Sequence, residues 1–535
     1  MEKEELDVLV IGGGITGAGI ALDATTRGMN TGLVEMQDFS AGTSSRSTKL
    51  VHGGLRYLQQ FEVKLVADVG KEREIVYENG PHVTTPEWML LPFHEGGNFG
   101  PFSSNIGLLV YDYLAGVKRS ERRKMLSAKE VTEKVSLLKR DGLKGAGYYV
   151  EYKTDDARLT IEVIKKAVEH GAKAVNYAKV TDFIYDQEKL VGVTVEDQIT
   201  KKTYNIFAKK IINAAGPWVD ELRDIDGSKE GKTLHLTKGV HLVFSKEAFP
   251  LNQAVYFDSP DGRMIFAIPR DHITYVGTTD TFYDGDIAHP KVTEEDRDYL
   301  LEAINYMFPT LHITKQDVIS SWAGLRPLIS QEGKKPGEIS RKDEIFISKS
   351  GLISIAGGKL TGYRKMAEDI VNLLSRQFKK ETGIIYSKSD TRNMPISGGD
   401  VGGSQGFELF KHQKLAKGNI LNLDKETSMK LIKRYGSNVD KVFLYIEEEK
   451  EEAKKYNLEP LVYAELLYAI HYECAYKPED FFIRRTGALF FEIEWVKSHY
   501  EDILKAMKEQ LNWTKEEYSL YKEQLEMYIE DAMIQ

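Results

Sequence analysis

Two histidines in this sequence have settings that suit a general base. His52 precedes two glycines at positions 53 and 54, and His241 lies in a segment that alternates like a strand. An imidazole takes up a proton near neutral pH without a large change in its pKa, so either side chain could deprotonate a bound hydroxyl group. A hydrogen-bonded core histidine is the alternative for each.

Four cations have settings that suit phosphate binding. A planar guanidinium donates two hydrogen bonds to a phosphate dianion, and a lysine ammonium adds a compact charge. A salt bridge to a carboxylate is the alternative for each cation, and Arg326 is also a candidate for polarising a substrate hydroxyl. The candidate set is Arg56, Arg263, Arg326 and Lys359, with Tyr57 and Thr361 as neutral donors.

A glycine-rich turn near the start of the chain is typical of a dinucleotide-binding site. Gly12, Gly14 and Gly17 fit the G-x-G-x-x-G spacing between an apolar run and a helical pattern. The first glycine permits a tight turn, the second lets the backbone approach a pyrophosphate, and the third lets the helix pack closely on the sheet. Glu35 ends the next predicted strand, where it would bind an adenosine ribose and repel a 2′-phosphate.

This first turn alone does not distinguish NAD from FAD. A second glycine turn at 357–362 follows an apolar strand and opens a predicted helix at 363–374. A helix N-terminus aimed at an isoalloxazine would stabilise the negative charge of a reduced flavin, which favours FAD. The expected FAD-binding residues are Gly12, Gly14, Thr16, Gly17, Glu35, Thr43, Ser44, Ser45, Ser47, Ala215, Gly216, Gly357, Gly358, Leu360 and Thr361.

The elements that must position these residues divide the chain into regions. Strand and helix patterns alternate at first, the segment 234–277 is mostly β, and the strand–glycine–helix pattern returns at 345–374. After a serine- and glycine-rich stretch the composition becomes helical. We predict an α/β fold with a discontinuous, doubly wound FAD-binding domain at 1–80, 150–232 and 340–385. An inserted antiparallel β substrate domain would occupy 81–149 and 233–339, a linker 386–407, and an all-α domain 408–535.

Composition narrows the class of protein. With 535 residues, 41% of them hydrophobic and 29% charged, the chain is long enough for several folded domains. Lys and Arg number 72 against 81 Asp and Glu, and this net charge of -9 argues against a nucleic-acid partner. The single cysteine, Cys474, fits a reducing compartment, and we expect no metal site. A charged N-terminus and the lack of long apolar stretches predict a cytoplasmic protein without a spanning helix.

Further motifs occur in order along the chain and carry a family resemblance. They are STKLVHGGLRYL at 47–58, NAAGPW at 213–218, GTTD at 277–280, AGLRP at 323–327, GGKLT at 357–361 and, more loosely, DFFIRRT at 480–486. Together with the first glycine turn they resemble the FAD-dependent, membrane-associated glycerol-3-phosphate dehydrogenases. The resemblance implies an FAD domain of the glutathione-reductase or D-amino-acid-oxidase type, a β-rich substrate domain and a helical cap. It adds Val180 as an adenine contact and ranks His52 slightly ahead of His241.

The resemblance also implies a reaction. The enzyme would oxidise sn-glycerol 3-phosphate to dihydroxyacetone phosphate by hydride transfer to the flavin, and would pass the electrons to a membrane quinone. The closest alternative is an oxygen-dependent glycerol-3-phosphate oxidase that forms hydrogen peroxide. An amine or amino-acid oxidase of the same fold and a catalytically silent FAD protein are further alternatives, and a homodimer is left open.

A basic segment suits contact with a membrane. Residues 115–124 are rich in lysine and arginine and follow the apolar run 106–110, a combination that can meet anionic lipid. A solvated basic helix is the alternative. We therefore expect a cytoplasmic protein that associates peripherally with the inner face of the cell membrane.

Overall fold

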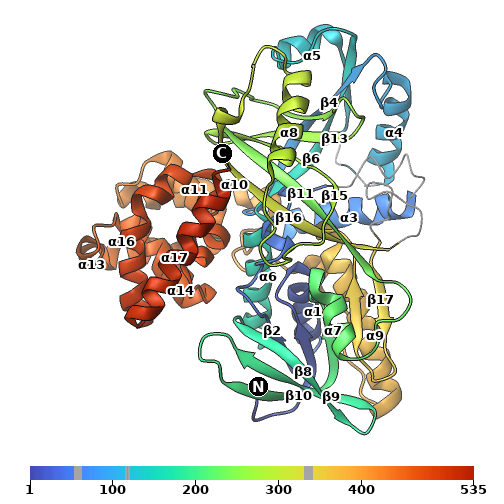
Figure 1. Ribbon diagram of the computed structural model, residues 1–535, viewed down its shortest axis with the longest axis vertical. Coiled ribbons are helices and arrows are strands. Elements are labelled where there is room, and N and C mark those ends of the chain that lie inside the picture. Colours follow the sequence, from blue (N-terminus) through green and yellow to red (C-terminus); the bar gives the residue numbers. More distant parts are fainter. Residues whose placement is uncertain (53–62, 115–116, 118–120, 331–341, 535) are drawn as a thin grey trace.

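The computed structural model describes residues 1–52, 63–114, 117, 121–330 and 342–534. These residues form two lobes built around β-sheets and a helical domain at their side (Figure 1). The two sheets have strand orders β17-β18-β10-β1-β2-β7 and β15-β11-β14-β13-β12-β4-β6-β3. These three parts agree with the predicted fold class.

The first sheet is parallel at its centre, as expected of a doubly wound domain. Parallel pairs join β1 to β10 and β2, β10 to β18, and β2 to β7, whereas β17 is antiparallel to β18. Its strands are β1 (Leu6–Ile11), β2 (Thr31–Val34), β7 (Lys173–Val175), β10 (Thr203–Asn213), β17 (Glu344–Ile347) and β18 (Ile353–Ala356), and it is extended by β8 (Ala178–Asp186) and β9 (Lys189–Asp197), of which β9 pairs antiparallel with β10. The apolar run of β1 is almost wholly buried because β1 lies between two other strands.

Helices and a hairpin cover this sheet. The helices α1 (Ile15–Thr26), α6 (Asp156–Glu169) and α9 (Tyr363–Thr382) share one hydrophobic cluster with β1. A second cluster joins β1 to the antiparallel hairpin of β8 (Ala178–Asp186) and β9 (Lys189–Asp197), and α7 (Val219–Ile225) follows the 3-10 turn at Gly216–Trp218. Residues far apart in the sequence therefore build one domain.

The second sheet forms the other lobe and is mostly antiparallel. One pair, β4 with β12, is parallel, so the predicted antiparallel pattern holds with that exception. Its strands are β3 (Leu50–Val51), β4 (Thr84–His94), β5 (Lys124–Ser127), β6 (Leu143–Thr154), β11 (Leu234–Ser245), β12 (Ala254–Asp258), β13 (Met264–Arg270), β14 (Ile273–Gly277), β15 (Thr281–Phe282) and β16 (Val318–Ile329). The lobe also carries α3 (Val63–Asn79), α4 (Pro101–Leu114), α5 (Ala128–Lys134) and α8 (Glu294–Met307).

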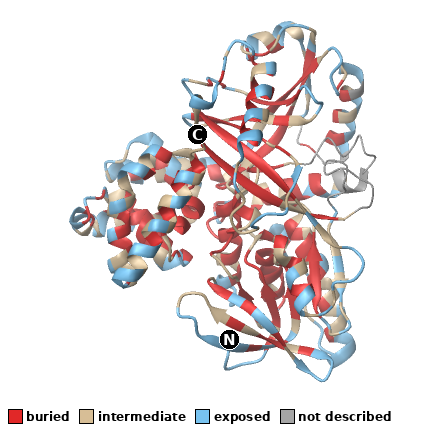
Figure 2. Ribbon diagram, in the orientation of Figure 1, coloured by how far each residue is buried: buried red, intermediate tan, exposed pale blue. Residues whose placement is uncertain are grey.

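The C-terminal part is helical, as its composition predicts. It contains α10 (Gly403–Ile420), α11 (Lys425–Tyr435), α12 (Val439–Glu448), α13 (Lys450–Lys455), α14 (Pro460–Glu473), the π-helical turn η9 (Asp480–Arg485), α15 (Ala488–Phe491), α16 (Ile493–Leu511) and α17 (Lys515–Ala532). The helix α10 begins inside the segment predicted as a linker. Buried residues run through the sheets and through the side of this domain that meets them (Figure 2).

Candidate functional site

A cavity of about 360 Å³ lies where β1, β2 and β18 end. Ligands of open α/β sheets bind at the carboxyl ends of parallel strands, so this is the expected place for a dinucleotide. The walls come from the first glycine turn, from the end of β2, from the turn η1 (Thr43–Ser45), from the start of β8 and from the segment after β18.

The backbone of the first glycine turn is shaped to receive a phosphate group. Gly12 has φ +113°, and a Cβ there would lie 2.5 Å from the carbonyl oxygen of Ala214. A Cβ at Gly14 would meet only Ser44 Oγ, at 3.2 Å, so the backbone at Gly14 is open to the cavity. The N-terminus of α1 faces the same space, where its positive end suits a pyrophosphate. These residues fit FAD.

The side chain of Glu35 binds the backbone of the first glycine turn. Its carboxylate accepts hydrogen bonds from the backbone N–H groups of Gly13 at 2.7 Å and Gln37 at 2.8 Å. Burial raises the pKa of this carboxyl, while the bonds from Gln37 and Gly13 oppose that rise. Glu35 is therefore oriented at the end of β2, where an adenosine ribose would lie.

Most of the predicted FAD-binding residues line this cavity. They are Gly12, Gly14, Thr16, Glu35, Thr43, Ser44, Ser47, Val180, Ala215, Gly216, Gly357, Gly358 and Leu360. Gly17, Ser45 and Thr361 are outside its lining. A Cβ at Gly17 would overlap the carbonyl oxygen of Gly12, so Gly17 supports the turn from behind. The carbonyl oxygen of Ser45 accepts from Lys49 at 3.0 Å.

The hydroxyl groups in this region also hold the protein together. Ser44 Oγ accepts a hydrogen bond from the N–H of Ile15, the first residue of α1, at 3.0 Å. Thr43 Oγ1 donates to the carbonyl oxygen of Leu325 at 2.7 Å, and Ser47 Oγ donates to Asp156 at 2.7 Å. Thr43 therefore links the cavity wall to β16 at Leu325, the residue that precedes Arg326.

Lys359 lines this cavity, and so does Pro327, whereas the preceding residue, Arg326, is not among the lining residues. Arg326 donates to the carbonyl oxygen of Thr279 at 3.2 Å, to Thr278 Oγ1 at 3.0 Å and to Asp280 at 3.3 Å. A Cβ at Gly239 would overlap the guanidinium, so this glycine makes room for Arg326.

His241 lies on β11 in a fully buried position. Its Nε2 is 3.0 Å from Thr48 Oγ1, and its ring stacks on Trp322 at 4.6 Å. Burial, followed by the charges of Arg326 and Lys49, holds the pKa of His241 well below its usual value. This environment disfavours a His241 that titrates near neutral pH, and the sequence did not reveal how deeply β11 is covered.

His52 occupies a different environment. It is half-buried, and its ring meets the edge of Phe266 at 6.0 Å. Thr361 Oγ1 donates to the carbonyl oxygen of His52 at 3.3 Å, which joins His52 to the returning glycine turn. The structure thus brings His52 and Thr361 together across more than three hundred residues.

Three predicted phosphate ligands are placed elsewhere or not described. Arg56 and Tyr57 lie outside the described residues. Arg263 pairs with Asp261 at 2.6 Å, and its guanidinium lies 4.0 Å from the centre of the Tyr299 ring. Arg263 is not among the cavity-lining residues.

Sequence reasoning missed several residues that support the site. Lys49 forms a buried ion pair with Asp156 at 2.6 Å, and its Nζ lies 5.7 Å from the centre of the Trp322 ring. Trp322 stacks on His241 and directly precedes the 323–327 motif, which was the available signal. Trp218 ends the 213–218 motif and lines the cavity. Within the described ranges, no group of three or more His, Cys, Asp or Glu side chains is placed to hold a metal ion.

Comparisons with known proteins cover almost the whole chain. The model of the FAD dependent oxidoreductase family matches residues 7–364, and the model of the C-terminal domain of alpha-glycerophosphate oxidase matches residues 389–518. The aerobic glycerol-3-phosphate dehydrogenase of Bacillus subtilis (strain 168) is 60% identical over 534 residues, which cover 100% of this chain and 96% of that protein. The protein of the same name from Staphylococcus haemolyticus is 56% identical, with 99% and 96% covered.

Solved structures show the same relation. The X-ray structure of the glycerol-3-phosphate dehydrogenase from Bacillus halodurans, complexed with FAD, has a TM-score of 0.87 and 52% identity, and the match covers 100% of this chain and 96% of that one. The L-alpha-glycerophosphate oxidase from Mycoplasma pneumoniae shares the fold, with a TM-score of 0.57 and 17% identity over 73% of this chain and 98% of that one. The predicted fold and cofactor are confirmed. The chain belongs to the FAD-dependent oxidoreductases and, within them, to the family of the aerobic glycerol-3-phosphate dehydrogenases.

Proposed function

We propose that this enzyme oxidises sn-glycerol 3-phosphate at its central carbon to dihydroxyacetone phosphate, with FAD supplying the hydride acceptor. The observation that carries the proposal is the position of Lys359 at the wall of the FAD cavity, where Pro327, the residue after Arg326, also lies. A small dianion held there would lie beside the cofactor. The named relatives, matched over the full chain, support this substrate.

We assign phosphate binding to Arg326 and Lys359, with Arg56 and Tyr57 as further candidates from the sequence. The hydrogen bonds to Thr278 and Thr279 hold the Arg326 guanidinium in one orientation, which reduces the entropy lost when an anion binds. The carboxylate of Asp280 offsets the positive charge while the site is empty. Arg263 is left out of this set because its guanidinium pairs with Asp261 and lies 4.0 Å from the centre of the Tyr299 ring, and neither Arg263 nor the residues next to it line the cavity.

We assign the hydroxyl proton to His52. A general base must be protonated readily, and burial together with Arg326 and Lys49 lowers the pKa of His241 and makes it a weak base. The Nδ1 of His241 is buried without a hydrogen-bond partner among the described residues, which suits a neutral imidazole that donates or accepts a single bond to substrate. His241 would then position the hydroxyl group.

Anaerobic addition of glycerol 3-phosphate to the purified holoenzyme tests the proposal. The expected result is loss of flavin absorbance at about 450 nm. Arg326→Ala and Lys359→Ala should each lower kcat/KM by roughly 10- to 100-fold while FAD stays bound, because each removes a charge-assisted hydrogen bond. Arg376→Ala, an exposed arginine of α9, is the control. Unchanged kinetics in both site variants would refute the phosphate assignment.

We propose a membrane quinone as the electron acceptor. An assay that follows hydrogen peroxide and the reduction of a soluble quinone in parallel separates this proposal from the oxidase alternative. Quinone reduction with little peroxide is expected. Stoichiometric peroxide without quinone reduction would make the enzyme an oxidase.

We also propose that the enzyme is cytoplasmic and that α4 brings it to the membrane. The outward face of α4 is apolar, since Phe102 is 79% exposed, Leu109 52% and Tyr113 86%, whereas Leu108 and Tyr111 are buried beneath it. The helix lies at the edge of the upper lobe (Figure 1). An amphipathic helix that turns its apolar face outward suits the boundary between lipid headgroups and acyl chains.

Basic residues beside α4 suit anionic headgroups. Arg122 and Lys124 are exposed. Arg123 is instead tied to the helix through Asn105 at 2.9 Å and Asp112 at 3.5 Å, so it orders the segment and contributes less to a free basic surface. Lys118 and Arg119 lie outside the described residues. None of the described helices combines the length and apolar character needed to cross a bilayer.

Sedimentation with vesicles of anionic phospholipid at low salt tests this docking surface. The wild-type enzyme should sediment, and the double variant Phe102→Ser and Leu109→Ser should stay in the supernatant. Ile385→Ser is the matched control, because Ile385 is 75% exposed at a distant position after α9. Equal sedimentation of the double variant and the wild type would exclude α4 as the anchor.

A further inference from the structure

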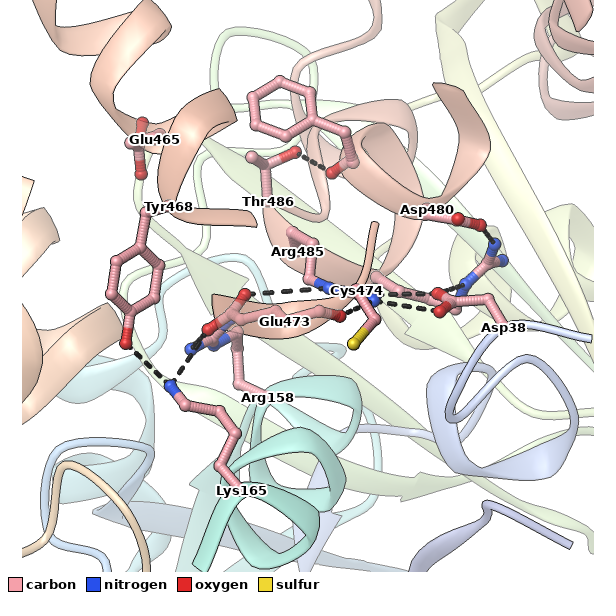
Figure 3. A network of polar contacts seen from close by, with 12 residues as sticks. Asp38, Arg158, Lys165, Glu465, Tyr468, Glu473, Cys474, Asp480, Arg485 and Thr486 are labelled. Atoms are coloured by element: carbon pink, nitrogen blue, oxygen red, sulfur yellow. Dashed lines mark hydrogen bonds and ion pairs between the residues drawn. The ribbon is translucent and has the colours of Figure 1, made fainter. Parts of the chain in front are cut away.

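The helical C-terminal domain touches the FAD-binding domain through a buried network of charges. Figure 3 shows Asp38 facing Arg485, with Glu473 and Arg158 on the other side of Cys474. Asp38 follows β2, and Arg158 lies on α6, so both belong to the FAD-binding side. Glu473 and Arg485 belong to the helical domain.

Asp38 is the centre of this contact. Its carboxylate accepts two hydrogen bonds from Arg485, at 2.7 and 2.9 Å, and one from Arg484 Nε at 2.6 Å. Asn176 donates a further bond at 2.9 Å. The Asp38 side chain is fully buried, so its charge is compensated almost entirely by residues of another domain. Burial raises the pKa of Asp38, but Arg485 and Arg484 lower it by a larger amount. The pKa therefore lies below its usual value, and the carboxylate stays ionised.

The segment that carries Asp38 also carries the adenosine side of the cofactor cavity. Glu35, Met36 and Ala41 line that cavity. Gln37 is bound on both sides, because its N–H donates to Glu35 at 2.8 Å and its carbonyl oxygen accepts from Tyr177 at 2.8 Å. Asp38 therefore lies within a short segment, 35–41, whose conformation sets the position of the Glu35 carboxylate.

A second contact reaches the same segment. Tyr177 Oη donates to Asp480 at 2.7 Å, and Asp480 is the first residue of η9. Tyr177 is followed by Ala178 and Val180, which line the cavity. The charge of Arg484 also acts on Glu35, where it opposes the rise in pKa that burial causes. The turn η9 thus touches both chain segments that flank the expected adenosine.

This contact couples the conformation of segment 35–41 to the position of η9, in addition to holding the two domains together. A buried carboxylate with its charged partners removed is strongly unfavourable, so segment 35–41 would rearrange if η9 withdrew. Glu35 would move with it because of the hydrogen bonds through Gln37.

We propose that the helical domain is a positioning element for FAD, in which Arg484 and Arg485 hold Asp38 and thereby fix Glu35 against the adenosine ribose. The proposal rests on the role of Glu35 in FAD binding. The helical domain would then help to retain the cofactor by its adenosine half, a role that is separate from substrate binding. Arg484 and Arg485 are positioning residues, since neither lines the cavity.

Affinity for FAD and for FMN in full-length variants tests this proposal, because FMN lacks the adenosine half. Asp38→Asn should raise the Kd for FAD by about tenfold or more, equivalent to about 1.4 kcal/mol, and leave the Kd for FMN unchanged. Glu465→Gln is the matched control, since Glu465 is a buried acid that pairs with Arg434 wholly inside the helical domain. Release of flavin fluorescence on dilution measures FAD loss, and titration of the deflavinated protein measures FMN binding.

Two more variants keep the test decisive. Tyr177→Phe removes only the bond to Asp480 and should weaken FAD binding to a lesser degree, which covers the case in which Asp38→Asn fails to fold. The double variant Glu35→Gln and Asp38→Asn should bind FAD no more weakly than Glu35→Gln alone, because Asp38 acts through Glu35.

The outcomes separate the two proposals. If Glu35→Gln leaves FAD affinity unchanged while Asp38→Asn weakens it, the ribose role of Glu35 is wrong and the proposed route from Asp38 through Glu35 is overturned with it. If Glu35→Gln weakens FAD binding while Asp38→Asn and Tyr177→Phe do not, the inference is overturned. Equal losses of FAD and FMN, or an equal loss in Glu465→Gln, would indicate general loosening and overturn it as well.

Discussion

Replacing Glu473 by glutamine should destabilise the joint between α6 and the helical domain. The Glu473 carboxylate accepts two hydrogen bonds from Arg158, at 2.6 and 2.7 Å, and one from Lys165 at 3.1 Å. Both Arg158 and Glu473 are fully buried. Glutamine keeps the shape of the side chain but leaves the buried cations short of one negative charge.

The size of the effect follows from the pKa of Glu473. Burial raises this pKa, but Arg158 and Lys165 lower it by more, from the usual 4.5 to about 2. Such a shift corresponds to about 3 kcal/mol of stability, in line with the 3–5 kcal/mol typical of a broken buried ion pair. Because the folded-state pKa is depressed, this stability is present above about pH 4.5 and is lost as the pH falls toward 2.

Urea unfolding at pH 7.5, followed by circular dichroism, measures this loss. The free energy of unfolding for the transition that includes the helical domain should fall by about 3 kcal/mol. Asp502→Asn is the control, because its pair with Lys505 is partly exposed and should contribute less than about 1 kcal/mol. A loss below about 1 kcal/mol in Glu473→Gln would refute the view that the network stabilises the joint.

Two further predictions concern the cofactor turn and the pH dependence of stability. Gly12→Ala should yield protein without FAD, judged by the ratio of absorbance at about 450 nm to that of the protein, because its φ is +113° and the new Cβ would lie 2.5 Å from the oxygen of Ala214. Gly28→Ala should keep its FAD, since Gly28 also has positive φ (+93°) but no atom within 4 Å of the added Cβ, and full FAD content in Gly12→Ala would contradict this reasoning. Burial, followed by the charge of Asp480, raises the pKa of Glu479 to about 7, so stability contributed by the protonated form is lost as the pH rises from about 4.5 to 7. Glu479→Gln should therefore raise Tm at pH 8 and flatten the pH profile, and a lower Tm at pH 8 would show that ionised Glu479 is stabilising.

The sequence predicted those features that depend on short stretches of chain. The turn at Gly12, Gly14 and Gly17 and the acid at Glu35 identify a dinucleotide site because each residue answers a local steric or electrostatic demand. The second glycine turn was recognised on the same grounds. The boundaries of β1 and the start of α1 agree with the apolar run and the helical pattern that follow each other there.

The environment of single side chains was beyond such reasoning. Whether His241 titrates near neutral pH depends on Trp322 and Arg326, which lie on a strand about eighty residues away in the sequence. Arg263 is a candidate phosphate ligand in the sequence, yet the tertiary fold sets its guanidinium 4.0 Å from the centre of the Tyr299 ring.

By itself, the sequence identified the family through the resemblance of its ordered motifs. It also indicated the cofactor and the α/β, β and helical parts, because glycine turns and hydrophobic periodicity act over a few residues. Only the tertiary structure decided which charges meet. Asp38 and Arg485 are separated by 447 residues, and nothing local in either segment indicates the other. Burial gives such a pair its energetic weight, and burial is a property of the assembled fold.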